Sequence, residues 1–173
     1  SDGAHTARLP LWVHVEPPLR KGAVLVIDND FSQFESYNNY TEYVDSALAA
    51  AGWSHEVWDA DKHYGSPQTI PDLADLQEYR AIIWVTGDNR HPDGYYQLPT
   101  PLTRDDQALL AQYLDGGGRL LALGQNLAEA SDVNPDSDPV YGRSAFLHHY
   151  LGARWLQGSL FGGLRRAFGH GRA

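Results

Sequence analysis

Short runs of apolar residues, separated by stretches with helical spacing, organise the middle of the chain. The clearest run, at 23–28, is aliphatic at consecutive positions and ends abruptly in Asp28, Asn29 and Asp30. A strand of this kind is typical of a parallel sheet that is covered on both faces. Three further runs predict strands at 54–58, 80–85 and 119–123.

Between the predicted strands, apolar residues recur every three or four positions. This spacing predicts a helix at 40–51 that stops at Gly52. Its apolar residues keep helical spacing: Tyr40, Tyr43, Val44, Ala47, Leu48 and Ala51. A second helix should begin at Thr103, because Thr103 and Asp106 resemble a capping box, and it should end at Gly116. Shorter helices are predicted at 71–76 and 144–151.

Strands that alternate with helices predict an α/β fold, namely a three-layer, doubly wound, mostly parallel sheet of flavodoxin-like type. We expect right-handed crossovers and the strand order 2-1-3-4-5, with the fifth strand at 154–156. The α/β domain should cover 22–159, followed by a Gly/Arg-rich tail at 160–173.

The N-terminal residues 1–21 do not follow the α/β pattern. The alternating sequence LPLWVHV at 9–15 predicts a strand, and Pro17 and Pro18 end it before a linker. Two interpretations remain open. The strand is either the end of a preceding β-sandwich domain or an additional strand of the α/β sheet.

The composition narrows the classes of function. The chain has 173 residues, 42% hydrophobic and 20% charged, and its net charge is −9. This charge argues against broad binding of nucleic acid or anionic lipid, and no apolar segment is long enough for membrane insertion. The chain has no cysteine, which excludes disulfides, thiolate metal sites and a cysteine nucleophile.

The ends of the predicted strands bring a set of candidate site residues to one rim of the sheet: Asp28, Asp30, Thr86, Asp88, Gly124 and Gln125. Ligands bind at this rim in open α/β sheets. A phosphoacceptor receiver domain also has acids there, but it needs a lysine near the fifth strand. The only lysines are Lys21 and Lys62, and neither is suitably placed.

Covalent catalysis is disfavoured at the turn after the fourth strand. A nucleophile elbow would place its attacking residue there, but neither Gly124 nor Gln125 can attack a carbonyl. A hydrolase that uses Asp28 or Asp30 as its base is the least favoured alternative, because the sequence offers no partner nucleophile.

Two groups of oxygen-bearing side chains are candidates for calcium. One has oxygen ligands at every second position, as an EF-hand loop begins: Asp132, Asn134, Asp136 and Asp138. However, Ser137 stands where that loop needs glycine and Arg143 where it needs glutamate, so a solvated acidic loop is the favoured interpretation. The other group is Asp28, Asn29 and Asp30, for which a structural role is likewise favoured.

The histidines give weaker signals. His63 lies close in sequence to Asp59 and Asp61, but nothing else in the sequence supports a site there. The adjacent His148 and His149 would point in different directions on a helix, so we expect them at the surface.

A set of motifs resembles one family of domains. The motifs are VLVIDND (24–30), YRAIIWVTGD (79–88), LTRDDQALLAQYLDGGG (102–118), LALGQN (121–126) and FLHHYLGA (146–153). Together they resemble the class I glutamine amidotransferase-like accessory domains of large secreted bacterial proteases, chiefly subtilisin-like serine peptidases and some metallopeptidases. The strand at 9–15 is similar to the end of the immunoglobulin-like domain that often precedes such a module.

The resemblance implies a non-catalytic role for this chain. True amidotransferases carry a cysteine at the turn where this chain has Gly124 and Gln125, so amidotransferase activity does not transfer. The catalytic triad of a subtilisin-like parent would lie in another domain. The resemblance therefore implies a secreted or cell-surface accessory domain whose partners are neighbouring domains of the same polypeptide.

The alternative is a stand-alone binding module. It would use the acidic rim to hold a cation or a carbohydrate, with aromatic side chains as stacking surfaces: Tyr37, Tyr40, Tyr95 and Tyr96.

Overall fold

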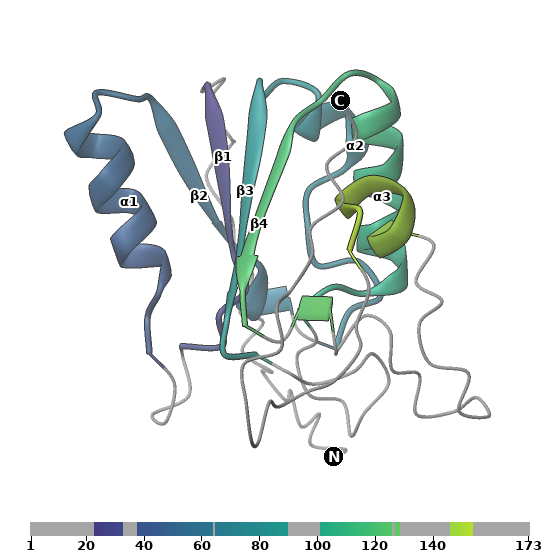
Figure 1. Ribbon diagram of the computed structural model, residues 1–173, viewed down its shortest axis with the longest axis horizontal. Helices are drawn as coiled ribbons and strands as arrows, with labels where there is room; N and C mark the ends of the chain where they lie inside the picture. Colours follow the sequence, from purple (N-terminus) through teal and green to yellow (C-terminus); the bar gives the residue numbers. More distant parts are fainter. Residues whose placement is uncertain are drawn as a thin grey trace, which may run out of the picture.

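A four-stranded parallel sheet forms the centre of the computed structural model, which describes residues 23–32, 38–63, 65–89, 101–125, 127–128 and 146–153. The strands lie in the order β2-β1-β3-β4 (Figure 1): β1 (Val24–Asp28), β2 (His55–Asp59), β3 (Ala81–Gly87) and β4 (Leu120–Gly124). This confirms an α/β fold and, for the first four strands, the predicted order. Each of these strands lies within two residues of its predicted bounds.

Several predicted features lie outside the described residues. They are the strand at 9–15 and the linker up to 21, the acidic loop with Asp132, Asn134, Asp136 and Asp138, the fifth strand at 154–156, and the tail at 160–173.

The central strand β1 is buried on both faces, as its apolar run predicts. Leu25 and Ile27 are fully buried in the larger core cluster, whereas Val24 and Val26 belong to a smaller cluster on the opposite face. Complete burial of each such side chain stabilises the fold by about 1.5–3 kcal/mol. The sheet thus has two apolar faces because alternate residues of one continuous apolar strand point in opposite directions.

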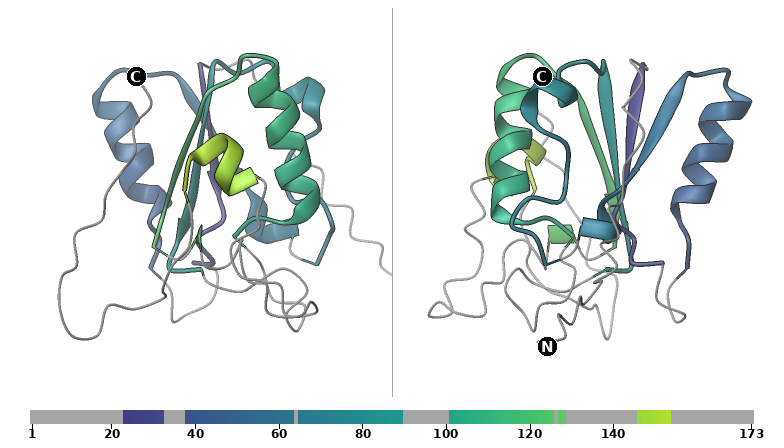
Figure 2. Two further views of the ribbon diagram at one scale, coloured as in Figure 1. Left: turned by 45° about the vertical axis from the view of Figure 1, so that its right-hand side comes forward. Right: turned by 180° about the vertical axis from the view of Figure 1, so that it is seen from behind.

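Helices lie on both sides of this sheet (Figures 1 and 2). Helix α1 (Thr41–Ala50) packs on the smaller cluster through Val44 and Leu48. Helices α2 (Leu73–Leu76) and α3 (Arg104–Asp115) pack on the opposite face, where Leu76 and Leu110 are fully buried.

Only some of the apolar residues of α1 contact the sheet. Tyr43 is 74% exposed, and Ala47 and Ala51 are exposed as well. Tyr40, Val44 and Leu48 form the stripe that meets the sheet, so the contact is narrower than the full set of apolar positions. The end of the helix agrees with the prediction, since the Gly52 N–H donates to the Ala49 carbonyl just past the last turn.

The capping box predicted at the start of α3 is confirmed. Thr103 Oγ1 accepts a hydrogen bond from the Asp106 N–H at 3.0 Å, and Asp106 Oδ2 accepts one from the Thr103 N–H at 3.3 Å. The fully buried Asp106 also accepts hydrogen bonds from the N–H and the hydroxyl of Thr69, both at 2.8 Å. One carboxylate therefore caps α3 and ties the loop before α2 to the start of α3.

Two short elements complete the described chain. The 3-10 helix η1 (Ala60–His63) follows β2, and the π-helical turn η2 (Leu147–Leu151) ends before Gly152, where the predicted helix at 144–151 also ends. His148 and His149 are exposed, as predicted. Among the described residues, none of the helices combines the length and the apolar character that a membrane span needs.

Candidate functional site

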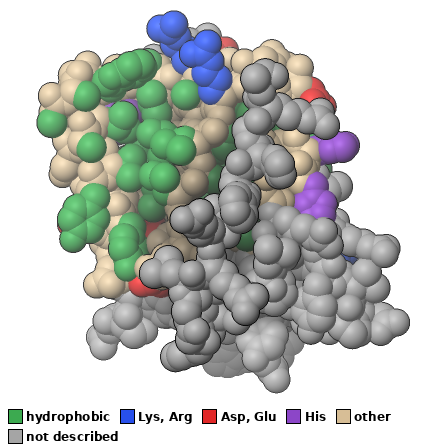
Figure 3. All heavy atoms as spheres, in the orientation of Figure 1, with side chains coloured by type: hydrophobic (Ala, Val, Ile, Leu, Met, Phe, Trp, Pro, Cys, Tyr) green, Lys and Arg blue, Asp and Glu red, His purple; other side chains and the backbone are tan. Residues whose placement is uncertain are grey.

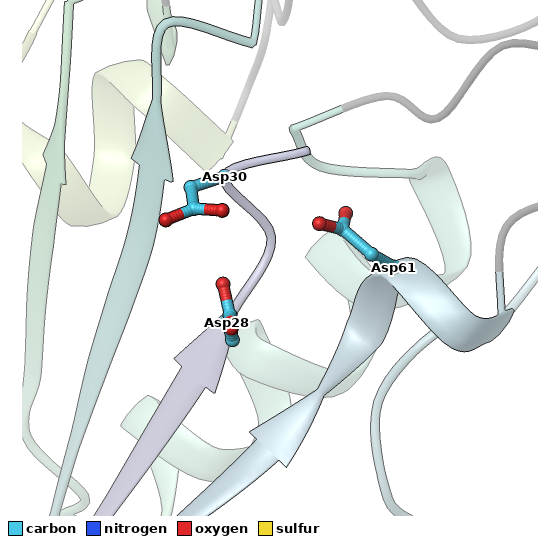
Figure 4. Close-up of side chains that lie close together, drawn as sticks. All are labelled: Asp28, Asp30 and Asp61. Atoms are coloured by element: carbon cyan, nitrogen blue, oxygen red, sulfur yellow. The ribbon is translucent and has the colours of Figure 1, made fainter. Parts of the chain in front are cut away.

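Three aspartates meet at the carboxyl end of β1 and β2. Asp28 is the last residue of β1, Asp30 follows in the next loop, and Asp61 lies in η1. Each offers one carboxylate oxygen within 4.8 Å of the others, and Figure 4 shows the three side chains facing a common space. We call Asp28, Asp30 and Asp61 the carboxylate cluster.

Asp30 joins the loop after β1 to the start of α1. Its side chain is fully buried. Oδ2 accepts hydrogen bonds from the N–H groups of Tyr40, at 2.6 Å, and Thr41, at 3.1 Å, and Oδ1 accepts one from the Ser32 N–H at 2.9 Å. The first N–H groups of a helix have no partner within the helix and carry partial positive charge. Asp30 therefore supplies, from another element, the cap that the first residues of α1 lack.

The other two carboxyl groups of the cluster are harder to ionise. Burial, with repulsion from Asp30 and Asp59, raises the pKa of Asp28 to about 6, against a hydrogen bond of 2.8 Å from the Thr41 hydroxyl. Burial, with repulsion from Asp28 and Asp30, raises the pKa of Asp61 to about 8, although Asp61 Oδ2 accepts the Phe31 N–H at 2.7 Å. Burial and mutual repulsion therefore favour the retention of a proton within the cluster at neutral pH.

The repulsion among the three carboxyl groups limits the chemistry that the cluster can perform. Closely placed carboxylates repel one another unless a proton or a cation lies among them. Carboxylate oxygens are also the ligands that hard cations such as Ca²⁺ prefer. The chemistry available at the carboxylate cluster is therefore proton retention or the binding of a cation, and each would compete with the other.

Of the three residues that the sequence offered as a disfavoured cation site, Asp28 and Asp30 belong to the carboxylate cluster, whereas Asn29 makes its hydrogen bonds elsewhere. Asn29 points to the other side of the loop, where its Nδ2 donates to the Pro101 carbonyl at 3.2 Å and its Oδ1 accepts from Asn89 Nδ2 at 3.4 Å. Asp61 takes the third position instead.

Asp61 could have been found from sequence. It follows the second strand, which the predicted order places next to the first, so its backbone had to reach the same rim. His63, which the sequence placed near it, stacks on Trp58 with ring centroids 4.9 Å apart and nearly parallel planes.

The other predicted rim residues lie towards β3 and β4. Asp88 Oδ2 accepts a hydrogen bond of 2.7 Å from the hydroxyl of Tyr40. The backbone N–H of the same tyrosine donates to Asp30. Thr86 is fully buried, and its hydroxyl donates to the Leu123 carbonyl at 3.3 Å. The rim thus has two parts, the carboxylate cluster and the adjacent ends of β3 and β4, and the hydroxyl of Tyr40 reaches the second part through Asp88.

The turn after β4 has no room for a side chain at its bend. A Cβ atom at Gly124 would overlap Thr86 Oγ1 and lie 3.1 Å from Thr86 Cβ. The next residue, Gln125, is exposed, and its N–H donates to the Gly87 carbonyl at 3.0 Å. The Thr86 side chain therefore occupies the space that a side chain at 124 would need, and the exposed position beside it holds an amide, which is not a nucleophile.

Comparison with models of protein families, with curated proteins and with solved structures finds no match to this chain.

Proposed function

We propose that this chain is a non-catalytic accessory domain of a larger secreted peptidase, most closely of the subtilisin-like serine type. One observation carries the proposal: the turn where the resembled amidotransferase-like domains would place a nucleophile holds Gly124 packed against Thr86 and an exposed Gln125. The finer fold assignment, a three-layer flavodoxin-like or class I glutamine amidotransferase-like domain, belongs to the same proposal. The strand order and the helices on both faces of the sheet support it.

The domain would act through contacts rather than chemistry. A secreted or cell-surface parent would carry its catalytic triad elsewhere, and this domain would pack against its neighbours in the same polypeptide or extend the surface that meets the substrate. The Thr41 hydroxyl that donates to Asp28 of the cluster belongs to a buried residue at the start of α1, which fits a role in packing or binding.

We expect the purified chain to show no peptidase activity. Casein and a panel of short chromogenic peptides should be hydrolysed no faster than in buffer, with subtilisin as the positive control. The proposal fails if turnover is reproducible and disappears in Asp28→Ala, because that result would make the carboxylate cluster a catalytic site.

A specific observation also favours a second candidate, a cation-binding module. The three carboxylates of the cluster offer oxygen ligands from β1 and η1 within 4.8 Å of one another. The carbohydrate version has less support, since Tyr37, Tyr95 and Tyr96 lie outside the described residues. The hydroxyl of Tyr40 is already bound to Asp88.

Calcium should then stabilise the protein at pH 7.5. A site with a dissociation constant of about 0.1 mM would add about 2.7 kcal/mol to the unfolding free energy at 10 mM calcium. Thermal or urea unfolding with and without calcium measures this increment, and Asp61→Asn should abolish it.

The acidic loop supplies the matched control. If the cluster binds the cation, Asp136→Asn leaves the calcium increment unchanged. If the acidic loop binds it, Asp136→Asn abolishes the increment and Asp61→Asn leaves it unchanged. No shift at millimolar calcium in the unmodified chain removes the cation-binding candidate.

A further inference from the structure

An imidazole ring lies against two oxygen acceptors where α1 turns into β2. His55 begins β2, and its Nδ1 lies 3.0 Å from the carbonyl oxygen of Trp53 in the turn. Its Nε2 lies 2.7 Å from Oδ1 of Asp45 on α1. A carbonyl and a carboxylate can only accept hydrogen bonds, and a neutral imidazole has a single N–H to donate. Both contacts are therefore satisfied together only when His55 is protonated. We call the ring of His55 with these two acceptors the imidazole contact.

The other charged groups around His55 are directed elsewhere. Glu42, the other acid of α1, is hydrogen-bonded to a side chain in the turn before the helix. Glu56 follows His55 on β2 and so points to the opposite face of the sheet, where its carboxylate accepts a tyrosine hydroxyl. On β1, the partner of His55 is the apolar Val24. Within the described part of the chain, Asp45 is therefore the charged group that acts on the ring.

The carboxyl half of α1 has a narrow attachment to the rest of the fold. Within 45–50, Leu48 packs against the sheet, and the other side chains are exposed. Figure 3 shows apolar side chains on the surface between α1 and β4, where Leu121 and Leu123 are 51% and 36% exposed. None of the described helices lies beside α1 on that face of the sheet (Figures 1 and 2). The imidazole contact therefore supplies a large part of what holds this half of the helix to β2.

The backbone transmits the imidazole contact to the last turn of the helix. The Trp53 N–H donates to the Leu48 carbonyl at 3.0 Å, and the carbonyl of the same tryptophan accepts from His55. The Ala51 N–H donates to the Ala47 carbonyl at 3.0 Å in the same turn. A change at the ring should therefore alter how often these two backbone hydrogen bonds open.

We propose that the imidazole contact is a pH-sensitive switch that fastens the carboxyl half of α1 and the turn after it to β2. When the ring loses its proton, one nitrogen presents a lone pair to an oxygen acceptor at hydrogen-bond distance. The side chain of Asp45 is 55% exposed, so its carboxylate can rotate into water and the contact opens on the α1 side. This inference goes beyond the proposed function, since it concerns a movement within the domain and holds whether or not the parent chain is a peptidase.

The direction of the switch follows from the bonds that the ring makes. The hydrogen bonds to the Trp53 carbonyl and to Asp45 raise the pKa of His55 above its ordinary value of 6.5, although partial burial opposes them. A histidine with a raised pKa contributes its stabilisation at low pH and loses it as the pH rises through the folded pKa. The switch is therefore closed in mildly acidic solution and opens as the pH rises.

Proton NMR of the full chain tests the contact itself. The His55 signal is the imidazole signal that disappears in His55→Gln. Its pKa should be lower in Asp45→Asn than in the unmodified protein, because an amide has no charge to attract the imidazolium. Glu42→Gln is the matched control, since it removes the other acid of α1 and should leave the pKa of His55 unchanged. A pKa that is the same in Asp45→Asn and the unmodified protein would overturn the proposal.

Amide hydrogen exchange tests the opening. Between pH 5 and 8, the protection factors of the Ala51 and Trp53 amides should fall about threefold relative to that of Gly116, the size expected for an exposed ion pair. Gly116 makes the corresponding backbone hydrogen bond at the end of α3. In Asp45→Asn the ratio should stay constant, because the amide can rotate and donate its own N–H to the neutral ring. A constant ratio in the unmodified protein, or an equal fall in Asp45→Asn, would contradict the switch.

Discussion

Raising the pH from 5 to 8 should lower the unfolding free energy of the metal-free protein by an amount on the order of 5 kcal/mol. A proton held only by the folded state contributes about 1.4 kcal/mol per pH unit, and Asp61 holds one over most of this range. The folded-state pKa values of Asp28, about 6, and Asp61, about 8, lie above the ordinary value of 3.8. A carboxyl group with a raised pKa stabilises the fold at low pH. It loses that contribution as the pH rises through its folded pKa.

The variant Asp61→Asn isolates the contribution of the cluster. An amide has no charge to repel Asp28 and Asp30, and its oxygen can still accept the Phe31 N–H. We expect this variant to be less sensitive to pH than the unmodified chain and more stable at pH 8. Urea unfolding followed by tryptophan fluorescence, in a chelating buffer at half-unit pH steps, measures both.

The comparison between variants is necessary because the contribution of His55 to stability also falls as the pH rises, as that of the cluster does. Its hydrogen bonds to the Trp53 carbonyl and to Asp45 raise its pKa, so its stabilising contribution is also lost as the pH rises. His55 is present in both Asp61→Asn and the unmodified protein, so its contribution cancels when their unfolding free energies are subtracted. Asp105→Asn serves as the carboxylate control, since Asp105 is exposed in the first turn of α3 and is not among the charges that raise the pKa of Asp28 or Asp61. A slope in Asp61→Asn equal to that of the unmodified chain would contradict the interpretation of the cluster.

The substitution Gly124→Ala should destabilise the protein by about 3 kcal/mol, at the upper end of the range for overpacking a buried contact. The added methyl group would overlap the Thr86 hydroxyl, and Thr86 is fully buried within β3. Strands β3 and β4 cannot separate to make room without breaking their parallel pairing, which joins Val85 to Leu123 and Gly87 to Gly124. Chemical denaturation gives the loss directly.

A double-mutant cycle separates this clash from general damage to the turn. Thr86→Ala removes the hydroxyl that the new methyl group meets, so the double variant should be more stable than the sum of the two single losses predicts. Gly116→Ala is the control, because its Cβ would meet neighbouring atoms at no less than 3.4 Å and should cost little. Additive losses in the cycle would show that Thr86 is not the obstacle.

Local sequence was sufficient for the elements of this fold. The consecutive apolar residues of β1 and β3 predicted strands buried on both faces, and Thr103 with Asp106 predicted the start of α3. These features depend on residues only a few positions apart, so their pattern is visible in the chain itself. The rim of the sheet followed, because parallel strands end on the same side.

The tertiary structure alone decided which side chains meet at that rim. Asp61 is 31 positions after Asp30, and only the pairing of β1 with β2 sets the two carboxylates side by side, while the turn of the loop directs Asn29 towards Pro101. Exposure was decided in the same way. The sequence shows that Tyr43 and Leu121 are apolar, yet both are exposed. A side chain is buried only where another element packs over it, and the packing of distant segments decides where that happens.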